Sequence, residues 1–108
     1  MIQIFYDRPL CRVTLRGHAH SAEPGKDLVC AGVSALACTL AANVQALEEQ
    51  GKVTEVKLRL EPGDARFQCR PEAGFGKAVR LAFDAVCLGF ALMSREYPGF
   101  VSYESRTG

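Results

Sequence analysis

The stretch that decides the fold runs from residue 28 to residue 70 and reads LVCAGVSALACTLAANVQALEEQGKVTEVKLRLEPGDARFQCR. Apolar residues in its first half recur every three or four positions, the period of an amphipathic helix. Its second half alternates apolar and polar residues twice around Pro62-Gly63, a pattern typical of two strands joined by a type II turn. We expect a helix from Leu28 to about Gln50, ended by Gly51, followed by a hairpin. The seam of the helix is Val29, Val33, Leu36, Leu40, Val44 and Leu47.

Working outward from this stretch, two further alternating runs precede it and a second helix follows it. Residues 2–6 and 11–15 flank Asp7-Arg8-Pro9 and predict an opening hairpin. The second helix is expected from about Gly74 to Arg95, with a last strand near residues 100–103. The order β-β-α-β-β-α-β predicts an α+β, two-layer sandwich with both helices on one face of a mostly antiparallel sheet of four or five strands. At 108 residues we expect a single domain over 1–108.

Two surfaces of this fold carry a distinctive composition. We expect the uncovered face of the sheet to be solvated and mostly basic. The second helix has an additional apolar row beside its seam, which either the first helix or a partner subunit must cover. The residues of the sheet face are Arg12, Thr14, Arg16, Glu55, Lys57, Arg59, Arg66, Gln68 and Arg70, and those of the row are Leu81, Ala85, Leu88 and Leu92.

Composition narrows the class of protein. The formal net charge of +1 gives no argument for nucleic acid or membrane partners. The N-terminal residues do not resemble a signal peptide, and the longest apolar run is interrupted by Ser, Thr and Asn, so we expect a cytoplasmic protein with no membrane span. The five cysteines form no CxxC pair and show no metal-ligand spacing, so we expect reduced thiols and no metal. Four of them fit core patterns; Cys30 does not.

Cys30 lies where a helix is predicted to begin. With Asp27 as N-cap, Cys30 falls in the first helical turn, where the helix dipole favours a thiolate. His18, on the preceding loop, is placed to fold back over the thiol as a base. The backbone N–H groups of Cys30 or Ala31 are candidate oxyanion donors. Asp27 either caps the helix or orients the His18 ring, and Cys30 taken alone is more readily explained by packing than by catalysis.

The pattern GHA-x-x-A-x-x-G-x-D-x-V-C-A-x-V-S resembles the signature of the ribosomal-processing cysteine protease Prp, or YsxB-like, family. The chain departs from the family pattern at Gly32, and His20-Ser21 occupy positions where the family varies. The resemblance places a catalytic dyad on His18 and Cys30 and supporting residues on Asp27 and Ser34. The matching positions are Gly17, His18, Ala19, Ala22, Gly25, Asp27, Val29, Cys30, Ala31, Val33 and Ser34.

The resemblance also implies a task. Prp enzymes remove a short N-terminal extension from a large-subunit ribosomal protein (L twenty-seven) and are homodimers that need no cofactor. In that family a mobile loop separates the histidine from the cysteine, and we expect Gly17 and Gly25 to supply the backbone freedom of hinges here. We therefore expect a homodimer built partly on the second helix, a ribosomal protein as substrate, and no direct binding of nucleic acid.

Two other classes of function compete with the peptidase hypothesis. A ribosome- or RNA-associated binding module would use the basic sheet face and leave Cys30 structural. A thiol redox sensor would need a resolving cysteine beside Cys30, and Cys38 is two helical turns away.

Overall fold

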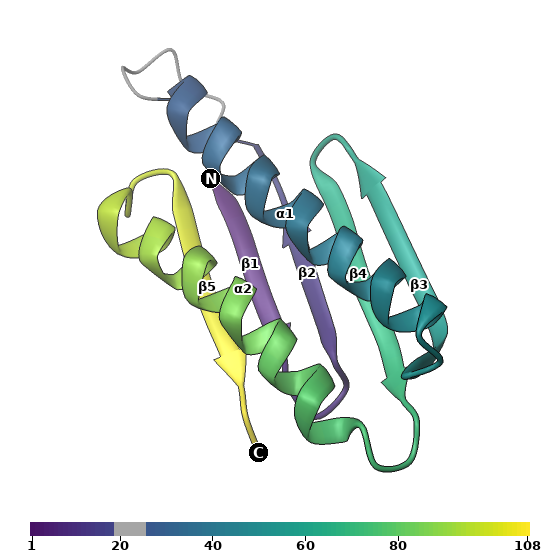
Figure 1. Cartoon of the computed structure of the whole chain (residues 1–108). Helices are drawn as coiled ribbons and strands as arrows, with labels where there is room; N and C mark the ends of the chain where they lie inside the picture. Colours follow the sequence, from purple (N-terminus) through teal and green to yellow (C-terminus); the bar gives the residue numbers. More distant parts are fainter. Residues whose placement is uncertain (19–25) are drawn as a thin grey trace.

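The computed structural model describes residues 1–18 and 26–108, with the side chains of Lys26 and Asp27 also outside the description. Within this part the predicted element order is confirmed (Figure 1). The elements are β1 (Ile2–Asp7), β2 (Arg12–Arg16), α1 (Lys26–Glu49), β3 (Val53–Glu61), β4 (Asp64–Pro71), α2 (Gly76–Glu96) and β5 (Val101–Arg106).

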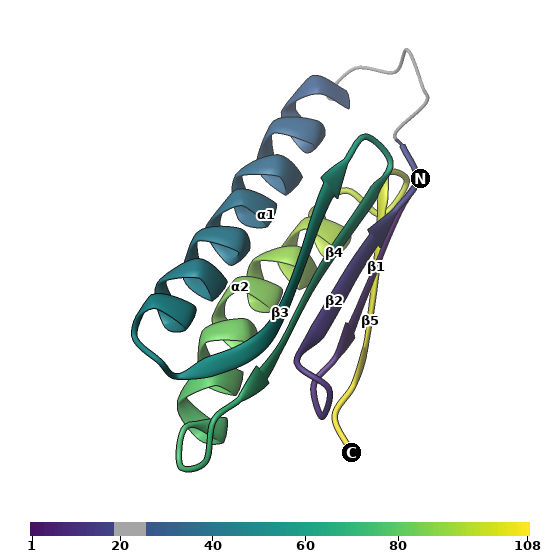
Figure 2. The same ribbon diagram turned by 90° about the vertical axis from the view of Figure 1, so that its right-hand side faces the viewer.

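The strands form one five-stranded sheet in the order β3-β4-β2-β1-β5. All neighbouring strands are antiparallel except β1 and β5, which run parallel. Figure 2 shows both helices on the same side of this sheet. The predicted two-layer α+β sandwich is therefore confirmed, and the parallel pair explains why the sheet is only mostly antiparallel.

The β3–β4 hairpin forms as the sequence predicts. Glu61 pairs with Asp64, which leaves Pro62 and Gly63 as the two residues of the turn. The φ angle of Gly63 is +73°, a conformation that favours glycine because a Cβ would crowd the backbone. This turn brings the end of the hairpin to the same end of the sheet as the end of β2, because Arg16 pairs with Asp64.

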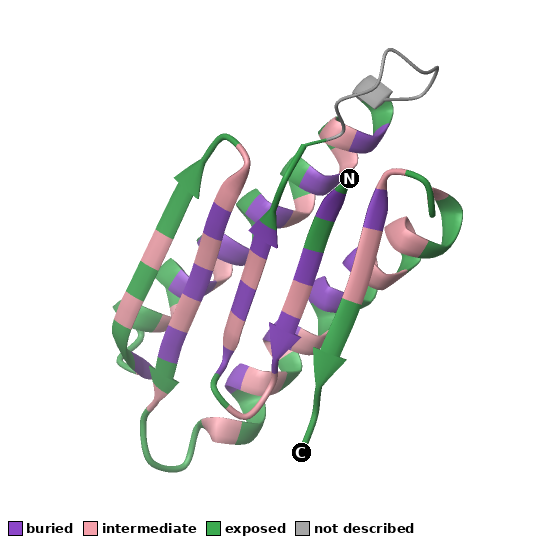
Figure 3. Cartoon of the chain, turned by 180° about the vertical axis from the view of Figure 1, so that it is seen from behind, coloured by how far each residue is buried: buried purple, intermediate pink, exposed green. Residues whose placement is uncertain are grey.

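The core lies between the sheet and the two helices. Burial alternates along β1, β2 and β4, as Figure 3 shows, and the largest fully buried side chains include Phe67, Phe83 and Phe90. The helices meet through glycines: a Cβ on Gly89 would lie 2.6 Å from Cδ2 of Leu36, and one on Gly32 would lie 2.8 Å from Cε of Met93. Gly32, the position that departs from the family pattern, thus lies at the contact between the helices, against the end of the Met93 side chain.

Two expectations need correction. α1 begins at Lys26, two residues before the predicted start, because helix boundaries are poorly fixed by periodicity. Cys38 is exposed and does not belong to the core, because it lies off the buried seam of α1. Residues Leu28–Glu49 are long and apolar enough to cross a membrane by length and composition, although core helices of soluble proteins pass the same test. Here the seam of this helix packs against the sheet.

The two surfaces singled out in the sequence are both accessible. None of the predicted residues of the outer sheet face is buried, but four of its arginines lie within ion-pair distance of carboxylates, so the charge of the face is largely balanced. On α2, Leu81, Leu88 and Leu92 are 53%, 63% and 47% exposed. The first helix therefore does not cover the second apolar row.

Candidate active site

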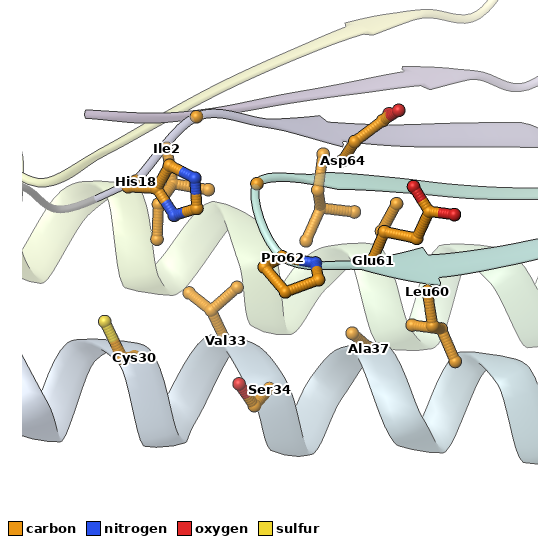
Figure 4. Close-up of a pocket in the computed structure, with 14 residues that line it drawn as sticks. Ile2, His18, Cys30, Val33, Ser34, Ala37, Leu60, Glu61, Pro62 and Asp64 are labelled. Carbon is orange, nitrogen blue, oxygen red and sulfur yellow. The ribbon is translucent and has the colours of Figure 1, made fainter.

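His18 and Cys30 line the same open cleft, of about 470 Å³, at one end of the molecule. The cleft lies between the end of β2, the start of α1 and the β3–β4 turn (Figure 4). Its walls combine apolar side chains from both layers with two carboxylates, Glu61 and Asp64, on the hairpin. The fold therefore brings together the thiol and the imidazole that the sequence separates by a loop.

His18 is held at the end of β2 by backbone contacts. The N–H of Gly17 donates to the carbonyl oxygen of Gly63 at 3.0 Å, and the nitrogen of Met1 donates to the carbonyl oxygen of His18 at 2.6 Å. Gly17 has a φ of +99°, and a Cβ there would overlap the carbonyl oxygen of Met1. The residue before the histidine must therefore lack a side chain and adopt a left-handed backbone conformation. This requirement explains the glycine at position 17 without any role as a hinge.

Cys30 projects from α1 into the cleft. Its neighbour Val29 is fully buried in the core, while Cys30 itself is half-buried. In Figure 4 its sulfur points from the helix toward the side of the cleft where His18 lies. Ser34, one turn further along α1, is exposed and lines the same cleft, so the predicted shared face of Cys30 and Ser34 is present.

The early start of α1 changes the predicted role of its first turn. Asp27 is the second helical residue and so does not occupy the N-cap position, and Cys30 is the fifth. In a helix that starts at Lys26, the N–H groups without a helical partner end with that of residue 28. The N–H groups of Cys30 and Ala31 lie beyond them, which weakens both as oxyanion donors. Any activation of the thiol then depends more on His18 than on the helix terminus.

Some expected site residues lie outside the described part of the chain. Gly25 and His20 are among them, so the hinge at Gly25 and the mobility of the loop stay predictions. Conversely, the hairpin contributes residues that the sequence analysis missed, namely Leu60, Glu61, Pro62, Gly63 and Asp64. Pro62-Gly63 marked a turn, but no local signal showed that this turn would reach the cleft.

The other thiols differ from Cys30. Cys11, Cys69 and Cys87 are buried, and burial raises the pKa of Cys69 and of Cys87 to about 12. Cys38 is exposed on α1 but does not line the cleft. Among the described residues, no group of three or more His, Cys, Asp or Glu side chains is placed to hold a metal ion.

Comparison with known proteins finds solved structures with the same fold. No curated protein matches the chain. The crystal structure of SMU.848 from Streptococcus mutans has a TM-score of 0.68 and 31% sequence identity, covering 100% of this chain and 96% of that one. The essential ribosomal processing protease Prp from S. aureus, in complex with a covalently linked product peptide, has a TM-score of 0.71 and 20% identity, covering 98% and 100%. The same protease with a substrate peptide has a TM-score of 0.65 and 20% identity, covering 97% of each chain.

The family match spans almost the whole fold. The model of the cysteine protease Prp family covers residues 1–102, which include every element from β1 to α2 and the start of β5. It also includes both residues of the predicted dyad. The chain belongs to the family of the cysteine protease Prp.

Proposed function

We propose that this cysteine protease is an endopeptidase that removes the short N-terminal extension of a large-subunit ribosomal protein (L twenty-seven), with Cys30 as nucleophile and His18 as base. The observation that carries the proposal is the shared cleft, which a thiol and an imidazole enter from different layers of the fold. The fold is also that of the S. aureus ribosomal processing protease crystallised with substrate and product peptides.

The chemistry follows from these two side chains. A ring nitrogen of His18 takes the proton of the Cys30 thiol, and the resulting thiolate attacks the carbonyl carbon of the scissile peptide bond. The protonated His18 then gives its proton to the departing amine, which leaves an acyl group on the sulfur. His18 next takes a proton from water, whose oxygen attacks the thioester and releases the carboxylate product and the thiol. Nothing in this cycle requires a metal or an organic cofactor.

The cleft suits a peptide in an extended conformation. It is open to solvent, and Val33, Ala37, Leu60 and Pro62 give it an apolar lining between α1 and the hairpin (Figure 4). Burial of apolar side chains from the substrate in this lining would supply binding energy close to the thiol. Ser34, on the same wall as Cys30, offers a hydroxyl group that can bond to the bound peptide backbone.

The exposed row on α2 supports a second part of the proposal, that the enzyme is a homodimer. Three leucines between about half and two thirds exposed form one stripe on the outer side of this helix. Such a stripe is costly in water and is typical of a subunit interface. We place the dimer in the cytoplasm, where ribosomal proteins are made, and propose no direct nucleic acid contact because the outer sheet face is largely paired.

The test is cleavage of the N-terminally extended ribosomal protein by the purified chain. Wild type should release the extension, and Cys30→Ala should lose all cleavage while keeping its circular dichroism spectrum. Cys38→Ala is the matched control, because it removes an exposed thiol from the same helix without entering the cleft. Cleavage by Cys30→Ala, or none by wild type, would refute the proposal.

A further inference from the structure

The β3–β4 turn lies directly against the ring of His18. A Cβ built on Gly63 would meet Nε2 of His18 first, with Cε1 at 2.6 Å and Cδ2 at 3.0 Å. Real Cβ atoms essentially never approach another heavy atom within 3.0 Å. The ring therefore occupies space that exists only because residue 63 has no side chain.

The same glycine also fixes the backbone that carries the histidine. Its carbonyl oxygen accepts the hydrogen bond from the N–H of Gly17, the residue before His18. The sheet sets this distance, since β2 and β4 pair through Leu15 and Ala65 at this end. Gly63 thus touches the histidine segment twice, once through its carbonyl group and once through its missing side chain.

The contact with Gly63 determines which edge of the His18 imidazole faces the β3–β4 turn. Because Nε2 is the ring atom nearest to the Cβ position of Gly63, the Nε2–Cε1 edge faces the turn. Figure 4 shows the other ring nitrogen on the side of the ring that faces α1, from which Cys30 projects. That nitrogen is Nδ1, so it lies on the side of the ring away from the β3–β4 turn.

From these contacts we propose that Gly63 is a positioning residue for the catalytic histidine: the turn seats the Nε2 edge of His18 and so presents Nδ1 to Cys30. The kinetic consequence of this inference rests on the proposed function, but the contact between Gly63 and the His18 ring is a property of the fold. No other residue type at 63 leaves the ring in this place. A displacement of the order of 1 Å in a catalytic group lowers the rate by about 10²-fold.

The chain supplies a matched control for the strain that any substitution adds. Gly51 has a φ of +72°, almost the same as the +73° of Gly63, yet a Cβ at Gly51 would meet nothing within 4 Å. Gly51→Ala therefore carries the backbone strain alone, whereas Gly63→Ala carries the same strain and the clash with His18. Gly63→Asn and Gly51→Asn form a second pair, because asparagine tolerates positive φ better than alanine.

The experiment compares these variants by kinetics and by NMR. Gly63→Ala should lower kcat by about 10²-fold with little change in KM and shift the pH profile of kcat/KM, while Gly51→Ala keeps wild-type values. In wild type, nuclear Overhauser effects should join the Gly63 α protons to the His18 ring protons, and Gly63→Ala should change the His18 ring nitrogen shifts. Equal kcat and pH profiles for the two alanine variants, or for the asparagine pair if Gly63→Ala does not fold, would overturn the proposal.

The NMR arm separates this inference from the proposed function. If wild type cleaves no ribosomal protein, the proposed function fails. The Overhauser effects still test whether the His18 ring packs against Gly63. Their absence in folded wild type would overturn it.

Discussion

The reactivity of the five cysteines offers a quantitative test of the site. Solvent access and catalysis predict opposite orders of reactivity for two of them, Cys38 and Cys30. Cys38 is exposed and Cys30 half-buried, so access alone predicts that an alkylating reagent modifies Cys38 first. If His18 takes the proton of Cys30, the thiolate should instead make Cys30 the fastest. The experiment is time-resolved alkylation at about pH 6.5, read residue by residue by mass spectrometry.

The expected rates follow from thiolate populations. Burial raises the pKa of Cys69 and of Cys87 from 9.0 to about 12, so these thiols hold about a thousandfold less thiolate than an ordinary one. Burial also raises the pKa of Cys11. An ordinary thiol is ~1% ionised at about pH 6.5, so pairing with His18 leaves room for a gain of at least about tenfold for Cys30 over Cys38.

The variant His18→Ala is the decisive control. It should bring the labelling rate of Cys30 down to or below that of Cys38 and leave the rate of Cys38 unchanged. Faster labelling of Cys38 in wild type, or a Cys30 to Cys38 ratio that His18→Ala does not alter, would refute the assignment of the dyad.

Three further outcomes test the rest of the structure. Leu88→Glu should convert the dimer to a monomer in sedimentation experiments, whereas Leu10→Glu, at an exposed leucine on the β1–β2 turn, should not; a monomeric wild type contradicts the interface. Folding raises the pKa of Cys69 and Cys87, so their contribution to stability is complete below about pH 9 and should be lost as pH rises toward 12; urea unfolding at about pH 8 and pH 10.5 measures this, and equal midpoints would contradict it. Phe67→Ala, at a fully buried side chain, should lower the free energy of unfolding by about 3–5 kcal/mol in the same assay, and a loss below about 1 kcal/mol would mean that this ring is not central to the core.

The sequence predicted the layers of the fold because periodicity reports burial directly. The seam of α1 and the alternation in β1, β2 and β4 are local patterns, and their apolar residues lie in the core or pack against it, whereas Leu60 on β3 is exposed. The start of α1 was harder to predict from the sequence, since Lys26 and Asp27 do not contribute to its apolar periodicity. Cys38 lies off the buried seam of α1, so the preference of cysteine for protein cores does not hold at this position.

Only the site residues that belong to the sequence motif could be predicted. His18, Cys30 and Ser34 belong to one continuous stretch, and the structure places all three on one cleft. The opposite wall comes from the β3–β4 turn, about 30 residues further along the chain, and its position depends on the pairing of β4 with β2. Strand order is a property of the whole sheet, so no local pattern reveals it.

The parallel pairing of β1 with β5 has a consequence for synthesis on the ribosome. Asp7 is buried and accepts hydrogen bonds from Arg106, 99 residues later, so one edge of β1 stays open until β5 has emerged. In contrast, the described residues that line the cleft all lie between Ile2 and Ala65. A nascent chain can therefore outline its cleft long before the last strand closes the sheet, and such long-range pairing makes the final step slow. Until that step, β1 is an unpaired edge exposed to other chains, a hazard that ends when β5 docks.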